Sequence, residues 1–332
     1  MDFGKLVALG QHLNRPECVL THASGLVFVS DWTGAGGISA INPHGQCQKL
    51  LANADPGAIR PNGIALEPDG CFLLAHLGDK NGGVFKLQAN GDISTLVTHA
   101  NGMPLPPTNF VIRDESGNLW ITVSTRKVPR AADYRQTASS GFIAVAEPGN
   151  TDARIVADNL GYTNECVIDL ERNFVYVNET FARRLSRYDI NADGMLSNGE
   201  AICHFGEGIY PDGLSMDEEG HLWIASIVSN RIIRIDPNGS QSIMHDDSDA
   251  QHVSNVESAF QHNRLESKHL SEVSEKTTLK HASSLAFGGA DRRSLYIGNL
   301  ADTKIHCANV NATGKELPHW NHSLGPLESW LH

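Results

Sequence analysis

The sequence predicts an all-β fold: a six-bladed β-propeller with four-stranded antiparallel blades around a central channel. Two observations lead to this prediction. One short phrase recurs six times along the 332 residues, and each copy is followed by alternating apolar runs and turn signals that describe a small antiparallel sheet. One position of the phrase, here called the anchor, recurs at intervals of 45, 47, 55, 48 and 71 residues, which is the period of a four-stranded blade. The anchors are Glu17, Asn62, Asn109, Asn164, Asp212 and Ser283.

The repeat sets the blade boundaries and leaves no linker between blades, so we expect residues 1–332 to form a single propeller domain. The predicted blades span about residues 15–59, 60–105, 106–160, 161–208, 209–246 and 281–320. The apolar segment 4–9 has no partner in its own repeat. We expect it to pair where the first and last blades meet, which removes an exposed sheet edge.

Two insertions interrupt the repeat. Residues 125–140 carry four positive charges and follow a predicted strand, so this segment is either a solvated loop or a flap across the channel mouth. Residues 246–280 are polar and compatible with helix, which makes them a lid, an interaction segment or a long loop.

The anchors predict a metal-binding channel. If the repeat is radial, the anchors occupy the same pleat of each innermost strand and point to the axis. Two carboxylates and three carboxamides then converge, and such oxygen donors suit a hard cation such as Ca²⁺ better than Zn²⁺. Asx residues beside Pro or Gly also start turns, but a turn role does not explain the glutamate at position 17. The predicted ligands are Glu17, Asn109, Asn164 and Asp212; Asn62 is a weaker candidate because a cation takes only about 6 to 8 oxygens, several of them from water.

A second calcium loop is the alternative interpretation of residues 189–200, which satisfy the EF-hand pattern at every position. An EF-hand needs a helix on each side, whereas these flanks read as the strands of a hairpin, so we predict a turn. The 16 histidines form no recognisable catalytic motif.

Composition excludes several partners. The net charge of −12 argues against nucleic acid and anionic membrane surfaces. No segment is apolar enough to span a bilayer, and the first residues do not read as a signal peptide. The six cysteines show no CxxC spacing, which predicts reduced thiols and a cytoplasmic protein. The oligomeric state is left open.

The repeat phrases carry a family resemblance. The phrases RPECVL, NLWIT, YTNECV, YPDGLSMDEEGHLWIA and SSLAFGG resemble the senescence marker protein / gluconolactonase / luciferin-regenerating enzyme family of six-bladed propellers, over about residues 10–320. The resemblance implies that Glu17, Asn164 and Asp212 bind one divalent cation, expected to be Ca²⁺, with Zn²⁺, Mn²⁺ and Mg²⁺ as alternatives. It also implies that Asn109 orients the substrate or binds the metal and that Asp212 is the general base or nucleophile.

The chain departs from the family at one place. Sugar lactonases of the family have an arginine two residues before the asparagine that corresponds to Asn109, and this chain has Pro107 there. The substrate is therefore predicted to be some lactone or ester rather than a polyhydroxylated aldonolactone, and Phe110 indicates a less polar pocket. A positive group comes instead from the insertion 125–140, with Arg126 and Arg130, or Arg135, as candidates; Asn62 is a further candidate for substrate binding.

The predicted function is metal-dependent hydrolysis of a small-molecule lactone or ester. The cation polarises the carbonyl, Asp212 takes a proton from water, and Asn109 assists. Two alternatives stay open: a phosphotriester hydrolase on the same metal, and a non-catalytic binding propeller that the metal stabilises. A strictosidine-synthase-like propeller is disfavoured because its chemistry does not call for a ring of oxygens.

Overall fold

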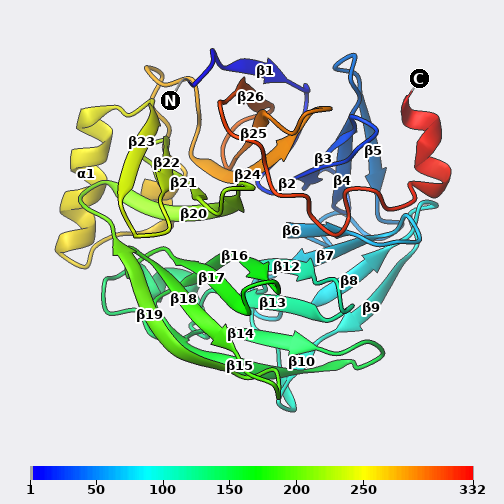
Figure 1. The fold of residues 1–332 in the computed structure, drawn as a ribbon, viewed down its shortest axis with the longest axis horizontal. Helices are drawn as coiled ribbons and strands as arrows, with labels where there is room; N and C mark the ends of the chain where they lie inside the picture. The colour runs from blue at the N-terminus through cyan, green and yellow to red at the C-terminus, as the bar shows by residue number, and fades with distance from the viewer. Residues whose placement is uncertain (1–2, 332) are drawn as a thin grey trace.

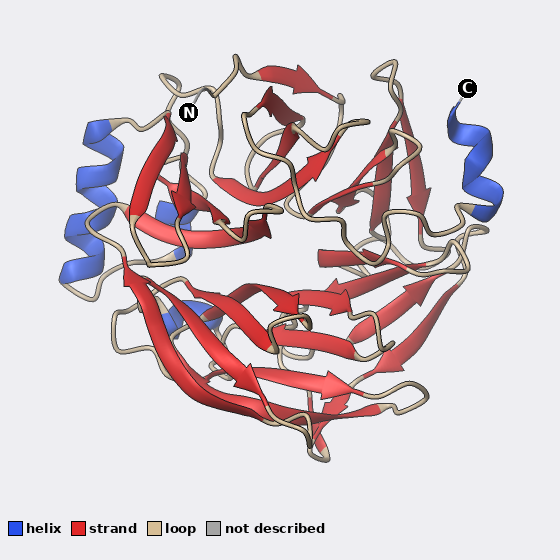
Figure 2. Ribbon diagram, viewed as in Figure 1, coloured by secondary structure: helices blue, strands red, loops and turns tan. Residues whose placement is uncertain are grey.

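Six sheets, antiparallel apart from the parallel pairing of β10 (His99–Ala100) with β15 (Asp152–Leu160), stand around a common centre in the computed structural model, which describes residues 3–331 (Figure 1). Each sheet is one blade, and in four of the six blades all strands follow one another in sequence from the channel outward. Figure 2 shows that strands make up the ring and that the long helix at the left and the helix at the C-terminus lie at its periphery. The predicted all-β six-bladed propeller is confirmed.

The blades are built from the following strands. The first three contain β2 (Val19–Thr21), β3 (Val27–Asp31), β4 (Gly37–Ile41) and β5 (Cys47–Leu51); β6 (Pro61–Leu66), β7 (Phe72–His76), β8 (Val84–Leu87) and β9 (Ile93–Val97); and β12 (Phe110–Arg113), β13 (Leu119–Val123), β14 (Gly141–Ala146) and β15 (Asp152–Leu160), extended by β10 (His99–Ala100) and β11 (Met103–Pro104). The last three contain β16 (Thr163–Asp169), β17 (Phe174–Glu179), β18 (Arg184–Ile190) and β19 (Leu196–His204); β20 (Ile209–Met216), β21 (Leu222–Val228), β22 (Arg231–Ile235) and β23 (Gln241–Asp246); and β24 (Ala282–Gly288), β25 (Ser294–Asn299), β26 (Ile305–Asn309) and β1 (Val7–Leu9).

The N-terminal strand closes the ring. β1 pairs antiparallel with β26, with Val7 opposite Cys307 and Leu9 opposite Ile305. Figure 1 shows β1, in blue, beside the orange and red strands of the last blade. The predicted pairing of segment 4–9 at the closure is confirmed, so backbone hydrogen bonds join the two ends of the chain.

Apolar side chains fill the space between blades. Phe28 and Phe72, from the second strands of the first two blades, are fully buried and meet edge to face with their ring centroids 4.9 Å apart. Because strand side chains alternate between faces, each sheet buries one row against each neighbouring blade. The blades are thereby fixed relative to one another and hold the channel residues in place.

Both insertions contain helix. Segment 125–140 includes the short 3-10 helix η1 (Arg130–Asp133), and the Thr125 hydroxyl donates a hydrogen bond of 2.6 Å to Asp133. Segment 246–280 forms α1 (Ala250–Gln261) and η2 (Ser267–Leu270). Phe260 of α1 is buried against Tyr210, with ring centroids 5.3 Å apart. None of the helices within residues 3–331 has the length and apolar character needed to cross a membrane.

Residues 189–200 form a β-hairpin, as the turn interpretation predicts. β18 and β19 pair with each other, and Ile190 lies opposite Leu196. Gly194 adopts a φ of 75°, the left-handed conformation that such a turn requires. The helices that an EF-hand needs do not flank this loop.

The C-terminal segment 315–331, here called the tail, crosses one end of the channel. Its backbone accepts a hydrogen bond from Ala23 at Trp320 (3.0 Å) and donates one from Lys315 to Met216 (2.9 Å). His322 lies 3.1 Å from the carbonyl oxygen of Leu66, and the tail ends in η3 (Gly325–Leu331). The tail therefore ties the fifth blade to the first two across this face.

Acid should loosen the tail, because His319 is buried in its neutral form. Burial lowers the pKa of His319 to about 4, and the neighbouring His322 and His22 add to the shift. An unfolded chain has a histidine pKa of about 6.5 and takes up the proton first as the pH falls. The stability that His319 contributes is thus present above about pH 6.5, and about 2 kcal/mol of it is lost between pH 7 and pH 5.

Urea unfolding at the two pH values measures this loss. His319→Gln should lose less stability on acidification than the unsubstituted protein, whereas the exposed His44→Gln should lose the same amount. Equal pH dependence in all three proteins would contradict the prediction.

Candidate metal centre

β-Bulges bring the anchors to the channel. In four blades the register of the innermost strand pair shifts at the anchor: between Pro61 and Ile64, Thr163 and Cys166, Pro211 and Leu214, and Ala282 and Leu285. The anchor and the residue after it are left out of the ladder, so both face the channel instead of alternating between faces. In the other two blades, Glu17 and Asn109 lie just before β2 and β12. The bulges thus bring Glu165 and Ser284, which follow their anchors, to the channel as well, where the repeat predicts the anchors alone.

The six anchors are here called the anchor ring. Its four predicted metal ligands are buried, and several of their oxygens receive no hydrogen bond. Glu17, Asn109, Asn164 and Asp212 are each no more than 4 % exposed. Glu17 Oε2, Asn109 Oδ1 and Asn164 Oδ1, which come from three blades, are buried without any hydrogen-bond partner. A buried acceptor without a donor costs about 1–3 kcal/mol, so three of them in one ring require an explanation. A cation among these oxygens provides one.

The donor set fits a hard cation. Within residues 3–331, no three His, Cys, Asp or Glu side chains gather as a metal-binding group. The centre therefore depends on carboxamide oxygens in addition to the carboxylates of Glu17 and Asp212. Such all-oxygen sets are typical of Ca²⁺.

Asn62 and Ser283 hold Glu17 in place rather than present free oxygens. Asn62 Nδ2 donates to Glu17 Oε1 (2.8 Å) and to the Asn109 carbonyl (3.0 Å). Asn62 Oδ1 accepts a bond of 2.8 Å from Arg15, and the Ser283 hydroxyl donates to the Glu17 carbonyl at 2.8 Å. Both anchors are thus positioning residues for the carboxylate.

The fourth and fifth blades orient Asn164 and Asp212 in a similar way. Asn164 Nδ2 donates to the Thr180 hydroxyl (3.0 Å), which donates to the Pro211 carbonyl (2.8 Å). Asn178 Nδ2 donates to the Asp212 carbonyl at 3.1 Å. With its amide nitrogen held by Thr180, Asn164 turns its oxygen to the channel.

Two carboxylates share this water-poor space. Burial raises the pKa of Asp212 well above its ordinary value, and the negative charge of Glu17 raises it further. Burial also raises the pKa of Glu17, while the positive charge of Arg15 acts in the opposite direction. A divalent cation between them would favour the ionised form of both.

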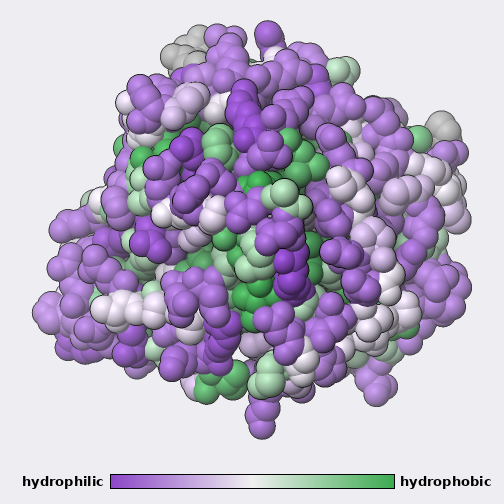
Figure 3. Space-filling view, turned by 60° about the horizontal axis from the view of Figure 1, so that its bottom comes forward, coloured by the Kyte–Doolittle hydropathy of each residue, from purple (hydrophilic) through white to green (hydrophobic). Residues whose placement is uncertain are grey.

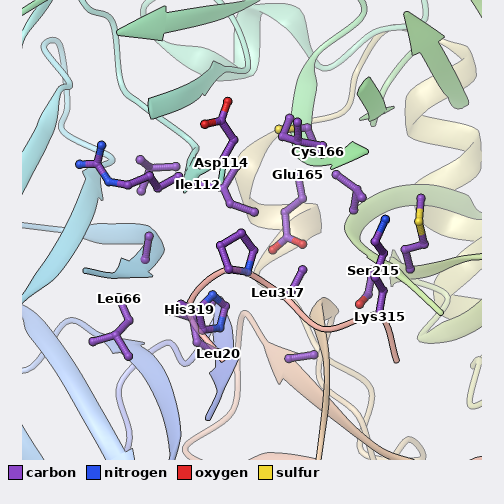
Figure 4. A pocket seen from close by; sticks show the side chains of 18 of the residues that line it. Leu20, Leu66, Ile112, Asp114, Glu165, Cys166, Ser215, Lys315, Leu317 and His319 are labelled. Atoms are coloured by element: carbon purple, nitrogen blue, oxygen red, sulfur yellow. The ribbon is translucent and has the colours of Figure 1, made fainter. Parts of the chain in front are cut away.

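A cavity of about 550 Å³ lies on the tail side of the anchor ring (Figure 4). Its lining includes Phe110, Glu165 and Cys18, which follow three of the anchors, and Leu317 and His319 of the tail. Glu165 Oε2 accepts a bond of 2.8 Å from the Leu214 amide. In Figure 3, hydrophobic surface gathers near the centre of the view, and hydrophilic residues surround that surface. The structure therefore places Phe110 in this cavity, on the side of the anchors away from the arginines described next.

Positive groups lie on the opposite side of the anchor ring, here called the arginine end. Arg15 and Arg130 both influence the pKa values of Glu17 and Asp212, so they stand close to the centre. Arg15 precedes β2 and Arg130 is the first residue of η1. Both are partly exposed, so solvent reaches the arginine end.

The structure brings Arg130 to the centre but not Arg126. Arg126 forms an exposed ion pair with Asp158 (2.7 Å) and lies over the Phe142 ring at 4.3 Å. The sequence interpretation overlooked Arg15, although a signal was available. Arg15 stands two residues before its anchor, the phrase position at which the family's arginine is expected in the third blade.

The residues two positions before the anchors are here called the rim: Arg15, Arg60, Pro107, Tyr162, Tyr210 and His281. Three of them have left-handed backbone: Arg15 (φ 56°), Tyr162 (φ 72°) and His281 (φ 60°). Such conformations are strained for residues other than glycine and are concentrated at functional sites. Tyr162 and Tyr210 of this rim belong to an aromatic cluster with Tyr134, Phe181 and Phe260.

Fold and site together define a class: a six-bladed propeller with a candidate cation centre on its axis. The chain belongs to the SMP-30/Gluconolactonase/LRE-like family, whose model matches residues 15–264. This membership confirms the resemblance seen in the repeat phrases.

The curated relatives are distant in sequence, and each aligns with only part of this chain. The lactonase drp35 of Staphylococcus saprophyticus is 24% identical over 187 residues, which are 54% of this chain and 54% of the relative. The protein STRICTOSIDINE SYNTHASE-LIKE 4 of Arabidopsis thaliana is 26% identical over 226 residues, 65% of this chain and 57% of the relative. The chain spans about half the length of the curated relatives it matches.

Solved structures agree on the fold. A gluconolactonase from Xanthomonas campestris superposes with a TM-score of 0.67 at 18% identity, covering 92% of this chain and 89% of that one. A calcium-binding protein, regucalcin, from Agrobacterium tumefaciens superposes with a TM-score of 0.62 at 18% identity, covering 96% and 95%.

Proposed function

We propose that the protein hydrolyses a lactone or a closely related ester with the help of one divalent cation. Glu17, Asn109, Asn164 and Asp212 would hold the cation, and their oxygen set favours Ca²⁺. The observation that carries the proposal is the group of three buried oxygens without partners, Glu17 Oε2, Asn109 Oδ1 and Asn164 Oδ1. Membership of a family that contains lactonases supports the reaction class.

Each side chain has a defined task in this proposal. When bound, the cation supplies Lewis acidity, which polarises the substrate carbonyl and stabilises negative charge on its oxygen. Asp212 takes the proton from the attacking water, and the bound cation would keep its carboxylate ionised for that role. Asn109 offers an amide N–H that can orient the carbonyl. Asn62 and Ser283 hold Glu17 in place through the hydrogen bonds described above.

A chelation experiment tests the proposal. Protein stripped with EDTA should lose activity on a panel of lactones of graded polarity, and Ca²⁺ should restore it because the centre binds the cation through oxygen donors alone. Mn²⁺, Zn²⁺ and Mg²⁺ are tested beside it. A phosphotriester in the same panel distinguishes the two hydrolytic classes.

Two results would overturn the proposal. Full activity after complete removal of metal would exclude the cation-dependent reaction. Calcium binding without hydrolysis of any lactone or ester in the panel would favour a binding propeller.

A further inference from the structure

Two guanidinium groups at the arginine end have no acidic partner. Within residues 3–331, neither Arg15 nor Arg130 takes part in an ion pair, in contrast to Arg113, which holds Glu67 through two bonds of 2.6 and 2.8 Å. Arg130 Nε is buried without any hydrogen-bond partner. An unpaired charge in a partly desolvated place is costly, so these two groups call for an anion.

The few contacts that the two arginines make leave most of their donors free. Arg15 Nη1 donates to Asn62, and its guanidinium lies over the Trp32 ring, 4.5 Å from the centroid. Arg130 Nη2 donates to the Ser124 hydroxyl at 3.1 Å, and its guanidinium lies over the Tyr162 ring at 5.5 Å. Each group is held in place by one hydrogen bond and one aromatic face. A guanidinium has five N–H donors, so several remain for a ligand.

The two groups converge, although they come from distant parts of the chain. Arg15 precedes the first blade, whereas Arg130 belongs to the insertion in the third blade. Arg15 stands two residues before the anchor Glu17, and Arg130 lies over the ring of Tyr162, which stands two residues before the anchor Asn164, so both guanidinium groups lie at the same end of the channel. The carboxylates of Glu17 and Asp212 act on both positive charges. A cation held by those carboxylates would take up their negative charge and leave the two guanidinium groups uncompensated unless a ligand supplies an anion.

A charge count gives the sign of that ligand. Glu17 and Asp212 contribute two negative charges, and Arg15 and Arg130 contribute two positive ones, so the four cancel. A divalent cation at the candidate centre leaves two positive charges, or one if Glu165 is also ionised. The loaded site is therefore positive and favours a ligand that carries negative charge.

We propose that Arg15 and Arg130 bind a carboxylate carried by the substrate, so that the lactones taken by this site are acid-bearing ones. This inference rests on the proposed function for the reaction, but the anion site itself stands on the two arginines alone. Planar guanidinium groups match a carboxylate through paired hydrogen bonds. The carboxylate would sit at the arginine end, with the reacting carbonyl toward Asp212.

Binding without turnover tests the anion site directly. The probe is tetrahydrofuran carboxylate, which has the ring of a lactone but no carbonyl to hydrolyse. Calorimetry with Ca²⁺-loaded protein should show binding that weakens with added NaCl and falls about tenfold to a hundredfold in Arg15→Met and in Arg130→Met. Lys127→Met, which removes an exposed positive charge from the same insertion, is the matched control and should bind as the parent does.

Turnover then tests the substrate class. The parent protein should prefer γ-butyrolactone with a carboxylate on its γ carbon over the matching carboxamide, mainly through KM. Arg130→Met should reduce that preference by about tenfold or more. If Arg130→Met does not fold, Arg130→Lys serves instead: it keeps the charge but loses the planar fork, so it should show part of the loss.

The outcomes separate the two proposals. No binding of the probe to the parent, or equal binding to the parent and both arginine variants, would overturn the anion site whatever the protein hydrolyses. Equal kcat/KM for the acid and the carboxamide would overturn the acid-bearing substrate. Arginine-dependent binding of the probe with no hydrolysis of any lactone would support the anion site and overturn the proposed function.

Discussion

Replacing Asp212 with asparagine should lower kcat by about 10² to 10⁴ at saturating metal, the range expected for the loss of a general base. Asparagine keeps an oxygen donor of the same reach, so a cation still has a ligand at this position. It cannot accept a proton, however, and it removes one of the two negative charges. Metal affinity should therefore fall moderately while turnover falls far more, as measured by calcium titration and by steady-state kinetics on the best lactone.

Asn164→Asp provides the contrasting variant. It adds a charge at a neighbouring anchor and should tighten cation binding, but it weakens Lewis acidity and so reduces kcat without removing the base. If Asp212→Asn regained nearly full activity once metal was saturating, Asp212 would be a ligand alone. The base would then have to be found elsewhere.

Replacing Glu17 with glutamine should weaken calcium binding by about 10- to 100-fold or more, because hard-cation sites tune affinity through the number of charged ligands. Asn62 Nδ2 donates to Glu17 Oε1, so a glutamine can still accept that bond and the fold should persist. A ligand that binds only the folded state raises its stability by mass action. The calcium-dependent rise in Tm should therefore shrink in Glu17→Gln at limiting calcium.

Glu115→Gln is the matched control, since it removes one negative charge from an exposed surface position. Its calcium affinity and its Tm with and without EDTA should equal those of the parent. A parent protein whose Tm is the same in calcium and in EDTA would rule out the stabilising role assigned to Glu17.

The repeat was sufficient to predict the ring, because a radial fold converts equal sequence positions into equal positions in space. It could not predict the bulges, since a shift in register depends on how Gly63 and Gly213 fit against their neighbours. A Cβ atom at Gly213 would lie 2.3 Å from the Ser283 carbonyl oxygen, and one at Gly63 would lie 2.7 Å from the Phe110 Cα. These close approaches between blades are properties of the assembled ring and leave no periodic signal.

The arginines also divide into those that the repeat could place and those that it could not. Arg15 lies within the repeat phrase, so its place at the rim could be derived from its distance to the anchor. Arg126 and Arg130 lie in an insertion without a counterpart in other blades, and nothing in their sequence distinguishes the one that turns to the channel from the one that pairs with Asp158. Helix in the second insertion was foreseen as a possibility, but its packing against Tyr210 depends on a contact across the chain.

The pairing of β1 with β26 also governs when the centre comes into existence during synthesis. During synthesis Glu17 emerges with the first blade and Asp212 with the fifth. β1, which completes the last blade, emerges first and has no partner until β26 has been made. A product that ends before β26 lacks the partner of β1, so its ring is not closed. A growing or truncated chain that lacks β26 therefore has no closed ring, and under the proposed function calcium binding would report that all six blades are complete.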